Sequence, residues 1–176
     1  MIDMFRIIGG RASGIALRFF LSHSSTKIYA EKLLKSIKIS KKSLLKALAE
    51  LEDCGLIGSE LQGRTKLYSL NRNDPVVMQL KRMLTMTEIV PQLRNLEGKA
   101  EIYIYGSAAR GEDIEDSDLD ILVVTKENRS TIMKGFGGLP QDKLNVVIMT
   151  QFEYAELSRK DKAFYERVEK DKVRVI

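Results

Sequence analysis

The stretch YGSAARGEDIEDSDLDILVV, residues 105–124, decides the fold of the second half of this chain. It starts at the end of an apolar strand, turns at Gly106, passes through an acidic loop and ends in a second apolar strand. Asp118 and Asp120 are two residues apart at the mouth of that strand, so both side chains point to one face. Two carboxylates so close repel each other unless a cation lies between them, which predicts a cation site here.

Alternating strand and helix patterns surround this stretch. Strands are expected at 100–105, 119–124, 143–149 and 172–176. A helix is expected at 126–136, and residues 151–170 are expected to form one long helix or two short ones. The run LDILVV is apolar without interruption, which predicts burial on both faces of the strand. The second half is therefore expected to be a small mixed-sheet α/β domain over residues 97–176.

The first half has a helical pattern followed by a hairpin. Apolar spacing predicts helices at 14–22, 24–37 and 75–90, and a third helix within 39–57 that Gly55 closes. A hairpin is predicted around the QGR turn within 56–70. Ser25 or Thr26 is a possible cap of the second helix, and Ser40 is a natural cap of the third. Pro91 is expected to end or kink the fourth, which places the domain boundary near 91–98.

Charge divides the chain at about the same place. Residues 1–96 carry a net charge of +8 and residues 97–176 a net charge of −3. A basic half suggests a polyanionic partner, and the alternative is ordinary variation of surface charge. No apolar run approaches the roughly 20 residues of a membrane span. The single cysteine fits a reducing cytoplasm, and cytoplasmic localisation is expected.

The run KKSLLKALAELEDCGLIGSELQGRTKLYSLN, residues 41–71, resembles the winged helix-turn-helix regulators of the ArsR and MarR type. The resemblance implies a DNA-binding domain over residues 1–90 that contacts double-stranded DNA, and a homodimer built on the helix at 75–90. The DNA-contacting side chains are expected on the third helix and at the hairpin tip: Ser40, Lys41, Lys42, Ser43, Lys46, Arg64 and Lys66. The alternative is a docking module whose lysines only solvate its surface.

The Gly-Ser turn and the aspartates together indicate phosphoryl transfer. A turn at Gly106 aims backbone N–H groups at a phosphate, and the Ser107 hydroxyl adds a donor. Arg110 would neutralise further phosphate charge. Mg²⁺ is held in proteins by one or two carboxylates together with substrate phosphates, which Asp118 and Asp120 would supply.

The spacing of Gly106-Ser107 and Asp118-Leu119-Asp120 is similar to that of the minimal nucleotidyltransferases of the DNA-polymerase-β-like superfamily. The resemblance covers residues 97–176. It implies that Gly106 and Ser107 bind a nucleoside triphosphate, with ATP the expected one, and that Asp118 and Asp120 hold two Mg²⁺ ions. A nucleotidyl group would then pass to a hydroxyl. Some relatives modify a small helical HEPN-type toxin partner, which is a further expectation.

One position departs from the family pattern. The family has a third carboxylate on the next core strand, where this chain has Asn145. An amide offers a carbonyl oxygen to a metal but is a poor general base. Glu101, Asp142 or Glu153 could substitute for the carboxylate, the enzyme could be slow, or catalysis could be lost.

The sequence thus leads to an α+β protein in which a DNA-binding domain precedes a nucleotidyltransferase. The alternative is a transcriptional regulator that binds nucleotide without catalysis.

Overall fold

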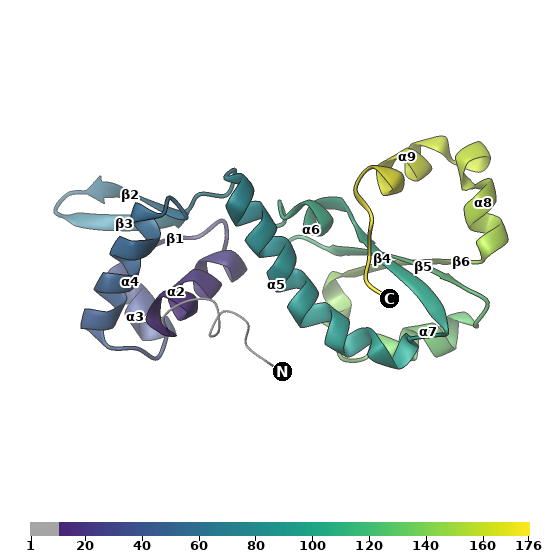
Figure 1. The fold of residues 1–176 in the computed structure, drawn as a ribbon, viewed down its shortest axis with the longest axis horizontal. Helices are drawn as coiled ribbons and strands as arrows, with labels where there is room; N and C mark the ends of the chain where they lie inside the picture. The colour runs from purple at the N-terminus through teal and green to yellow at the C-terminus, as the bar shows by residue number, and fades with distance from the viewer. Residues whose placement is uncertain (1–10) are drawn as a thin grey trace. The chain divides into compact units, whose positions relative to one another are not determined.

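The computed structural model describes residues 11–176, which divide into two compact units (Figure 1). The first unit ends at Lys81 and the second runs from Arg82 to Ile176. The division falls inside helix α5 (Pro75–Leu93), ahead of the boundary expected near 91–98. Pro91 lies within α5, so the proline does not end that helix. The first ten residues of the expected 1–90 domain lie outside the described residues.

The first unit combines helices with a three-stranded sheet. Its elements before α5 are α2 (Arg11–Ser22), β1 (Lys27–Tyr29), α3 (Ala30–Ser36), α4 (Lys41–Asp53), β2 (Ile57–Gln62) and β3 (Thr65–Leu70). The strands are antiparallel in the order β1-β3-β2. Phe20, Leu33, Leu48 and Ile57 are almost fully buried and bring helices and sheet into one core. The hairpin and the third helix are as predicted.

The helix expected over residues 24–37 is shorter than predicted. Lys27–Tyr29 forms β1 instead, and α3 begins at Ala30 after Tyr29, which makes no side-chain capping bond. Ile28 pairs with Tyr68 of β3 and is 4 % exposed. A β-branched and an aromatic residue suit a strand, and pairing with the hairpin outweighed the helical spacing of the apolar residues. Ser25 and Thr26 therefore do not cap a helix.

The second unit is built on a mixed four-stranded sheet. After α5 and the short turn η1 (Arg94–Leu96), its elements are β4 (Ala100–Tyr105), α6 (Gly106–Arg110), β5 (Leu119–Thr125), α7 (Arg129–Gly135), η2 (Gln141–Lys143), β6 (Leu144–Met149), α8 (Gln151–Lys160), α9 (Lys162–Asp171) and β7 (Val173–Arg174). The strand order is β6-β5-β4-β7, in which only the β5–β6 pair is parallel. The mixed sheet predicted for this half is confirmed.

Helices cover both faces of this sheet (Figure 1). On one face Ile104 and Ile121 pack with Leu93 from the end of α5 and Phe136 after α7. On the other face Leu122 and its neighbours on the sheet pack against α9. The central strand β5 is buried from Ile121 onward, as its apolar run predicted. Polar side chains are therefore left to the strand ends.

Candidate functional site

Strand register brings the distant parts of the acidic motif to one end of the sheet. The antiparallel β4–β5 ladder places Tyr105 opposite Asp120, and the parallel β5–β6 ladder places Asp120 opposite Asn145. Gly106 directly follows Tyr105, and Asp118 directly precedes β5. The sequence predicted that these residues act together, and the structure places them side by side.

Gly106 packs directly against the Asp120 carboxylate. Its φ of 73° lies in the left-handed region, and an ideal Cβ at this position would lie 2.5 Å from Asp120 Oδ2. Both the backbone conformation and the close approach therefore require glycine. The turn and the carboxylate are therefore in direct contact at one corner of the site.

Asn145 is the partner of Asp120 on the opposite side from Gly106. Its Nδ2 donates a hydrogen bond of 2.8 Å to Asp120 Oδ1. An ionised carboxylate only accepts hydrogen bonds, so the amide must present its NH₂ group to it. This bond orients the Asp120 carboxylate from the β6 side. The exposed side chain of Asp118, by contrast, makes no hydrogen bond or ion pair with another residue in 11–176.

The carboxylate oxygens at this end of the sheet suit a small hard cation that is also bound by the phosphates of a substrate. Residues 11–176 contain no group of three or more His, Cys, Asp or Glu side chains able to hold a metal ion. Asp118 and Asp120 would supply two carboxylates, and Asp118 has no competing protein partner among the described residues. Mg²⁺ is commonly bound by one or two carboxylates plus substrate phosphates, so this donor set fits it.

The three substitutes considered for the third carboxylate lie in different places. Glu101 pairs with Val124 near the other end of the β4–β5 ladder, and its Oε2 accepts a bond of 2.7 Å from Tyr103. Glu153 closes a capping box with Thr150 beyond the far end of β6. Asp142 lies in η2, which leads into β6 at the same end as Asn145. The first two are therefore excluded from the site by position.

A carboxylate that sequence reasoning missed completes the Gly106 turn. Asp171 ends α9, and its Oδ1 accepts a 3.2 Å hydrogen bond from the Gly106 N–H. Its Oδ2 pairs with Arg110 Nη1, while Arg110 Nε donates to Glu112 Oε2 at 2.7 Å. The hydrogen bonds to Glu112 and then to Asp171 raise the pKa of Arg110. The only sequence signal of Asp171 is an acidic residue at the end of a predicted helix.

Lys143, the last residue of η2, contacts the acidic loop that leads to Asp118. Lys143 Nζ donates to the Glu115 carbonyl at 2.5 Å and lies 3.9 Å from Asp116 Oδ1. Within the loop, the Ser117 hydroxyl accepts a 2.9 Å bond from the Ile114 N–H. Lys143 is thus a second residue that the sequence did not single out, and it fixes the approach to β5.

Tyr105 is a buried neighbour of the site, at the end of β4, directly before Gly106 and opposite Asp120. It is 1 % exposed, and its hydroxyl has no hydrogen-bond partner among the described residues. Burial, followed by the nearby charge of Asp120, raises its pKa. The hydroxyl therefore stays protonated at neutral pH and is unsuited to act as a base.

The side chains predicted to contact DNA fall into two groups. Lys41, Lys42 and Arg64 are exposed and form no ion pair with the residues that the structure describes. The others already have partners within the first unit: the Ser40 and Ser43 hydroxyls are 2.8 Å apart, Lys46 lies 3.7 Å from Glu50, and Lys66 lies 2.9 Å from Glu52. Ser40 also caps α4 by accepting from the Ser43 N–H at 3.1 Å, as predicted.

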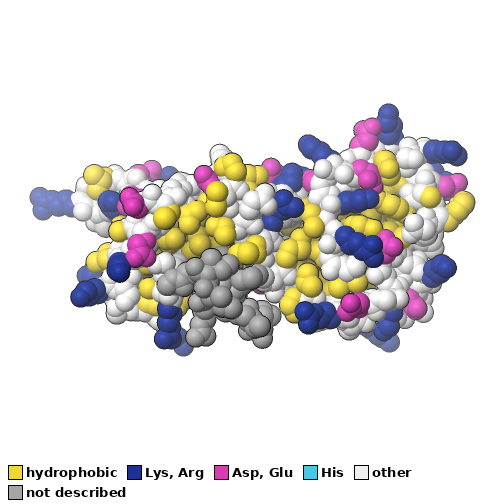
Figure 2. All heavy atoms as spheres, in the orientation of Figure 1, with side chains coloured by type: hydrophobic (Ala, Val, Ile, Leu, Met, Phe, Trp, Pro, Cys, Tyr) yellow, Lys and Arg dark blue, Asp and Glu magenta, His cyan; other side chains and the backbone are white. Residues whose placement is uncertain are grey.

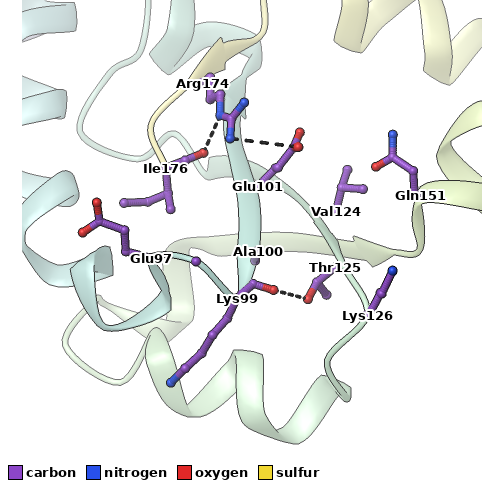
Figure 3. Close-up of a pocket in the computed structure, with 11 residues that line it drawn as sticks. Glu97, Lys99, Ala100, Glu101, Val124, Thr125, Lys126, Gln151, Arg174 and Ile176 are labelled. Atoms are coloured by element: carbon purple, nitrogen blue, oxygen red, sulfur yellow. Dashed lines mark hydrogen bonds and ion pairs between the residues drawn. The ribbon is translucent and has the colours of Figure 1, made fainter.

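A separate cavity of about 520 Å³ opens at the other end of the sheet (Figure 3). Lys99, Thr125 and Arg174 help to line it, and Arg174 Nη2 lies 4.0 Å from Glu101 Oε1. Along β5 the cavity begins at Val124, four residues beyond Asp120 and so roughly 13 Å away. Glu101, one of the three possible substitutes for the third carboxylate, lines this cavity, whereas Gly106, Ser107, Arg110, Asp118, Asp120 and Asn145 do not.

Comparison with known proteins identifies the second unit. A family model for the nucleotidyltransferase domain matches residues 86–175. A crystal structure of a provisionally assigned nucleotidyltransferase from Sulfolobus solfataricus is 21% identical over 58% of this chain and 88% of its own, with a TM-score of 0.37. No curated protein matches the chain. Among residues 11–176, no helix has the length and apolar character to cross a membrane.

Proposed function

Because the chain belongs to the nucleotidyltransferase domain family, we propose that its second unit transfers a nucleotidyl group from a nucleoside triphosphate, with ATP as the expected donor, to a hydroxyl. The observation that carries the proposal is the register that joins Gly106, Asp120 and Asn145 at one end of the sheet. It supports a site in which a phosphate-binding turn faces metal-binding carboxylates.

Each residue of this corner has a proposed role. The triphosphate binds to the Ser107 hydroxyl and to the backbone of the Gly106 turn other than the Gly106 N–H, which already donates to Asp171. Asp118 and Asp120 hold Mg²⁺, with room in the family pattern for two ions. Bound Mg²⁺ would neutralise phosphate charge as a Lewis acid. Arg110 is not assigned to the phosphates, because two carboxylates already neutralise it.

In the proposed reaction the acceptor oxygen forms a bond to the α-phosphorus, and the bond from that phosphorus to pyrophosphate breaks. Asn145 cannot take the hydroxyl proton, because an amide is not a base at neutral pH. The proton therefore leaves to water. Asn145 instead orients Asp120 through its 2.8 Å hydrogen bond. The chain contributes by positioning the reactants and by its charge, and none of these residues is assigned as a general base.

The second candidate is a nucleotide-binding regulator without turnover, and Asn145 is the observation that favours it. Incubation with Mg²⁺, α-labelled ATP and candidate acceptors separates the two. Pyrophosphate release that disappears in Asp118→Asn and Asp120→Asn, but persists in the loop control Asp116→Asn, supports the enzyme. Tight ATP binding without release under all acceptors supports the regulator. Absence of both would overturn the nucleotide site itself.

We also propose that the first unit is a winged helix that binds double-stranded DNA. Its element order and β1-β3-β2 sheet support this proposal, as does the exposure of Lys41, Lys42 and Arg64. Figure 2 shows Lys and Arg side chains projecting at the hairpin end of this unit. An anisotropy titration of labelled duplex DNA at several salt concentrations tests the proposal.

Two partners remain proposals. A tyrosine of a HEPN-type helical protein is one candidate acceptor, and a small-molecule hydroxyl is the other. The homodimer expected through residues 75–90 has limited apolar surface available on α5, because Val77 is fully buried and Ile89 is 6 % exposed. Val76, at 58 % exposed, is the large apolar side chain of α5 that is open to a partner. Sedimentation of the full chain would establish whether it dimerises.

A further inference from the structure

Asp171 occupies an unusual place for a carboxylate. It is the last residue of α9, where the helix dipole is negative, and its side chain is only 9 % exposed. A negative charge at a helix C-terminus is electrostatically unfavourable, and burial adds a desolvation cost. Charge-assisted bonds from Arg110 and from the Gly106 N–H offset both costs. The contacts with Arg110 and Gly106, rather than the helix, therefore explain why a carboxylate is tolerated at this position.

The contacts form a continuous chain into the site. Asp171 Oδ1 fixes the N–H of Gly106, and the Cα of Gly106 packs against Asp120 Oδ2. Asp120 Oδ1 in turn accepts from Asn145. Movement of Asp171 would therefore change the orientation of the Gly106 peptide and release one side of the Asp120 carboxylate.

The helix that carries Asp171 is itself anchored to the sheet. Val168 is fully buried against the face formed by Tyr105 and Leu122. Phe164 meets the Tyr105 ring edge-on, with 5.9 Å between ring centroids. A rigid helix can transmit a fixed position to the Gly106 turn, which a side chain on a loop could not do as well.

We propose that Asp171 and Arg110 act as a brace: Asp171 is a positioning residue that holds the Gly106 turn in the geometry that receives the triphosphate, and Arg110 holds Asp171. This inference rests on the proposed nucleotide site. It assigns Arg110 a role different from the phosphate contact expected from the sequence. Arg110, Glu112 and Asp171 together carry a net charge of −1, so the group as a whole does not attract a triphosphate.

Calorimetric titration of the full chain with ATP in saturating Mg²⁺ tests the brace. The variants are Asp171→Asn, Arg110→Gln and the double substitution, with Glu166→Gln as a control. Glu166 is an exposed carboxylate on the same helix, 3.6 Å from Lys162. Asp171→Asn keeps an acceptor for the Gly106 N–H but removes the charge that binds Arg110. Thermal unfolding of each variant establishes that it is folded at the titration temperature.

The brace predicts that each single substitution weakens ATP binding by about tenfold, the lower end of the range for residues that orient ligand-binding groups. The double variant should be no weaker than either single one, because both remove the same brace. Tighter binding in Asp171→Asn would overturn the proposal and show that the carboxylate competes with phosphate for Arg110. Additive decreases in affinity, or unchanged affinity with only a lower melting temperature, would overturn it as well. If the wild type itself binds no ATP, the proposed nucleotide site is wrong, and the brace, which rests on that site, is wrong as well.

Discussion

At the scale of single residues, Gly106 is the position where the site is least tolerant of change. Gly106→Ala should lower the free energy of unfolding by about 1–3 kcal/mol, because alanine resists a positive φ and its Cβ would meet Asp120 Oδ2. Urea unfolding measures the decrease. Gly98→Ala is the matched control, since Gly98 has a φ of 76° with no atom within 4 Å of a Cβ. Equal decreases in the two variants would contradict the close approach to Asp120.

Asn145→Asp tests the vacant third-carboxylate position. The new carboxylate would lie beside Asp120, where Asn145 Nδ2 is now 2.8 Å from Asp120 Oδ1. Repulsion should lower the melting temperature in EDTA, whereas added Mg²⁺ should restore it and lower the Mg²⁺ concentration needed for pyrophosphate release. Melting curves across a Mg²⁺ series measure the change in stability, and pyrophosphate release across the same series measures the change in activity. A variant that melts like the wild type in EDTA and gains nothing from Mg²⁺ would show that this position is not part of the cation site.

Residues close in sequence were predictable, and residues brought in from afar were not. Gly106, Asp118 and Asp120 follow from local spacing, because strand geometry fixes which side chains share a face. Asn145 followed from the resemblance to the nucleotidyltransferases, which carry a carboxylate on the next core strand where this chain has an amide. Asp171 could not be predicted, because the sequence around it does not indicate that the end of α9 contacts the Gly106 turn.

At the scale of elements, Glu52 joins α4 to the hairpin. It accepts from Ser59 of β2 at 2.5 Å and from Lys66 of β3 at 2.9 Å. The Ser59 bond first, and then the Lys66 bond, lower the pKa of Glu52. A lowered folded pKa stabilises the fold above the ordinary value of about 4.3, and this stabilisation disappears as pH falls through the folded pKa.

Glu52→Gln should therefore lower stability at pH 6, and this difference from the wild type should be smaller at pH 3. Urea midpoints of the wild type and the variant at both pH values measure this, with Asp53→Asn as a control on the same helix. A gap between wild type and Glu52→Gln that is as wide at pH 3 as at pH 6 would contradict the role of the ionised carboxylate.

The same hairpin explains why β1 escaped prediction, since Ile28 becomes a strand residue only when β3 is present to pair with it.

At the scale of the whole molecule, charge differs between the two halves of the sequence, with net values of +8 for residues 1–96 and −3 for 97–176. Substitution of Lys41, Lys42 and Arg64 together by glutamine should weaken binding to duplex DNA. It should also flatten the dependence of affinity on salt by about 0.9 in log–log slope for each phosphate that the protein no longer neutralises. Anisotropy titrations measure the slope. Lys46→Gln is the control, because Lys46 already pairs with Glu50. Unchanged slope and affinity in a folded triple variant would remove this surface from DNA binding.

The most direct measurement of the central claim is the affinity for ATP as a function of Mg²⁺ concentration, in the wild type, Asp118→Asn, Asp120→Asn and the loop control Asp116→Asn. The account predicts tight binding only with Mg²⁺, because the carboxylates repel the triphosphate until a cation lies between them. Asp118→Asn and Asp120→Asn should weaken Mg²⁺-dependent binding by about 10–100-fold, and Asp116→Asn should leave it unchanged. Equal ATP affinity in EDTA and in Mg²⁺, or undiminished binding in both site variants, would contradict a metal-dependent nucleotide site at this end of the sheet.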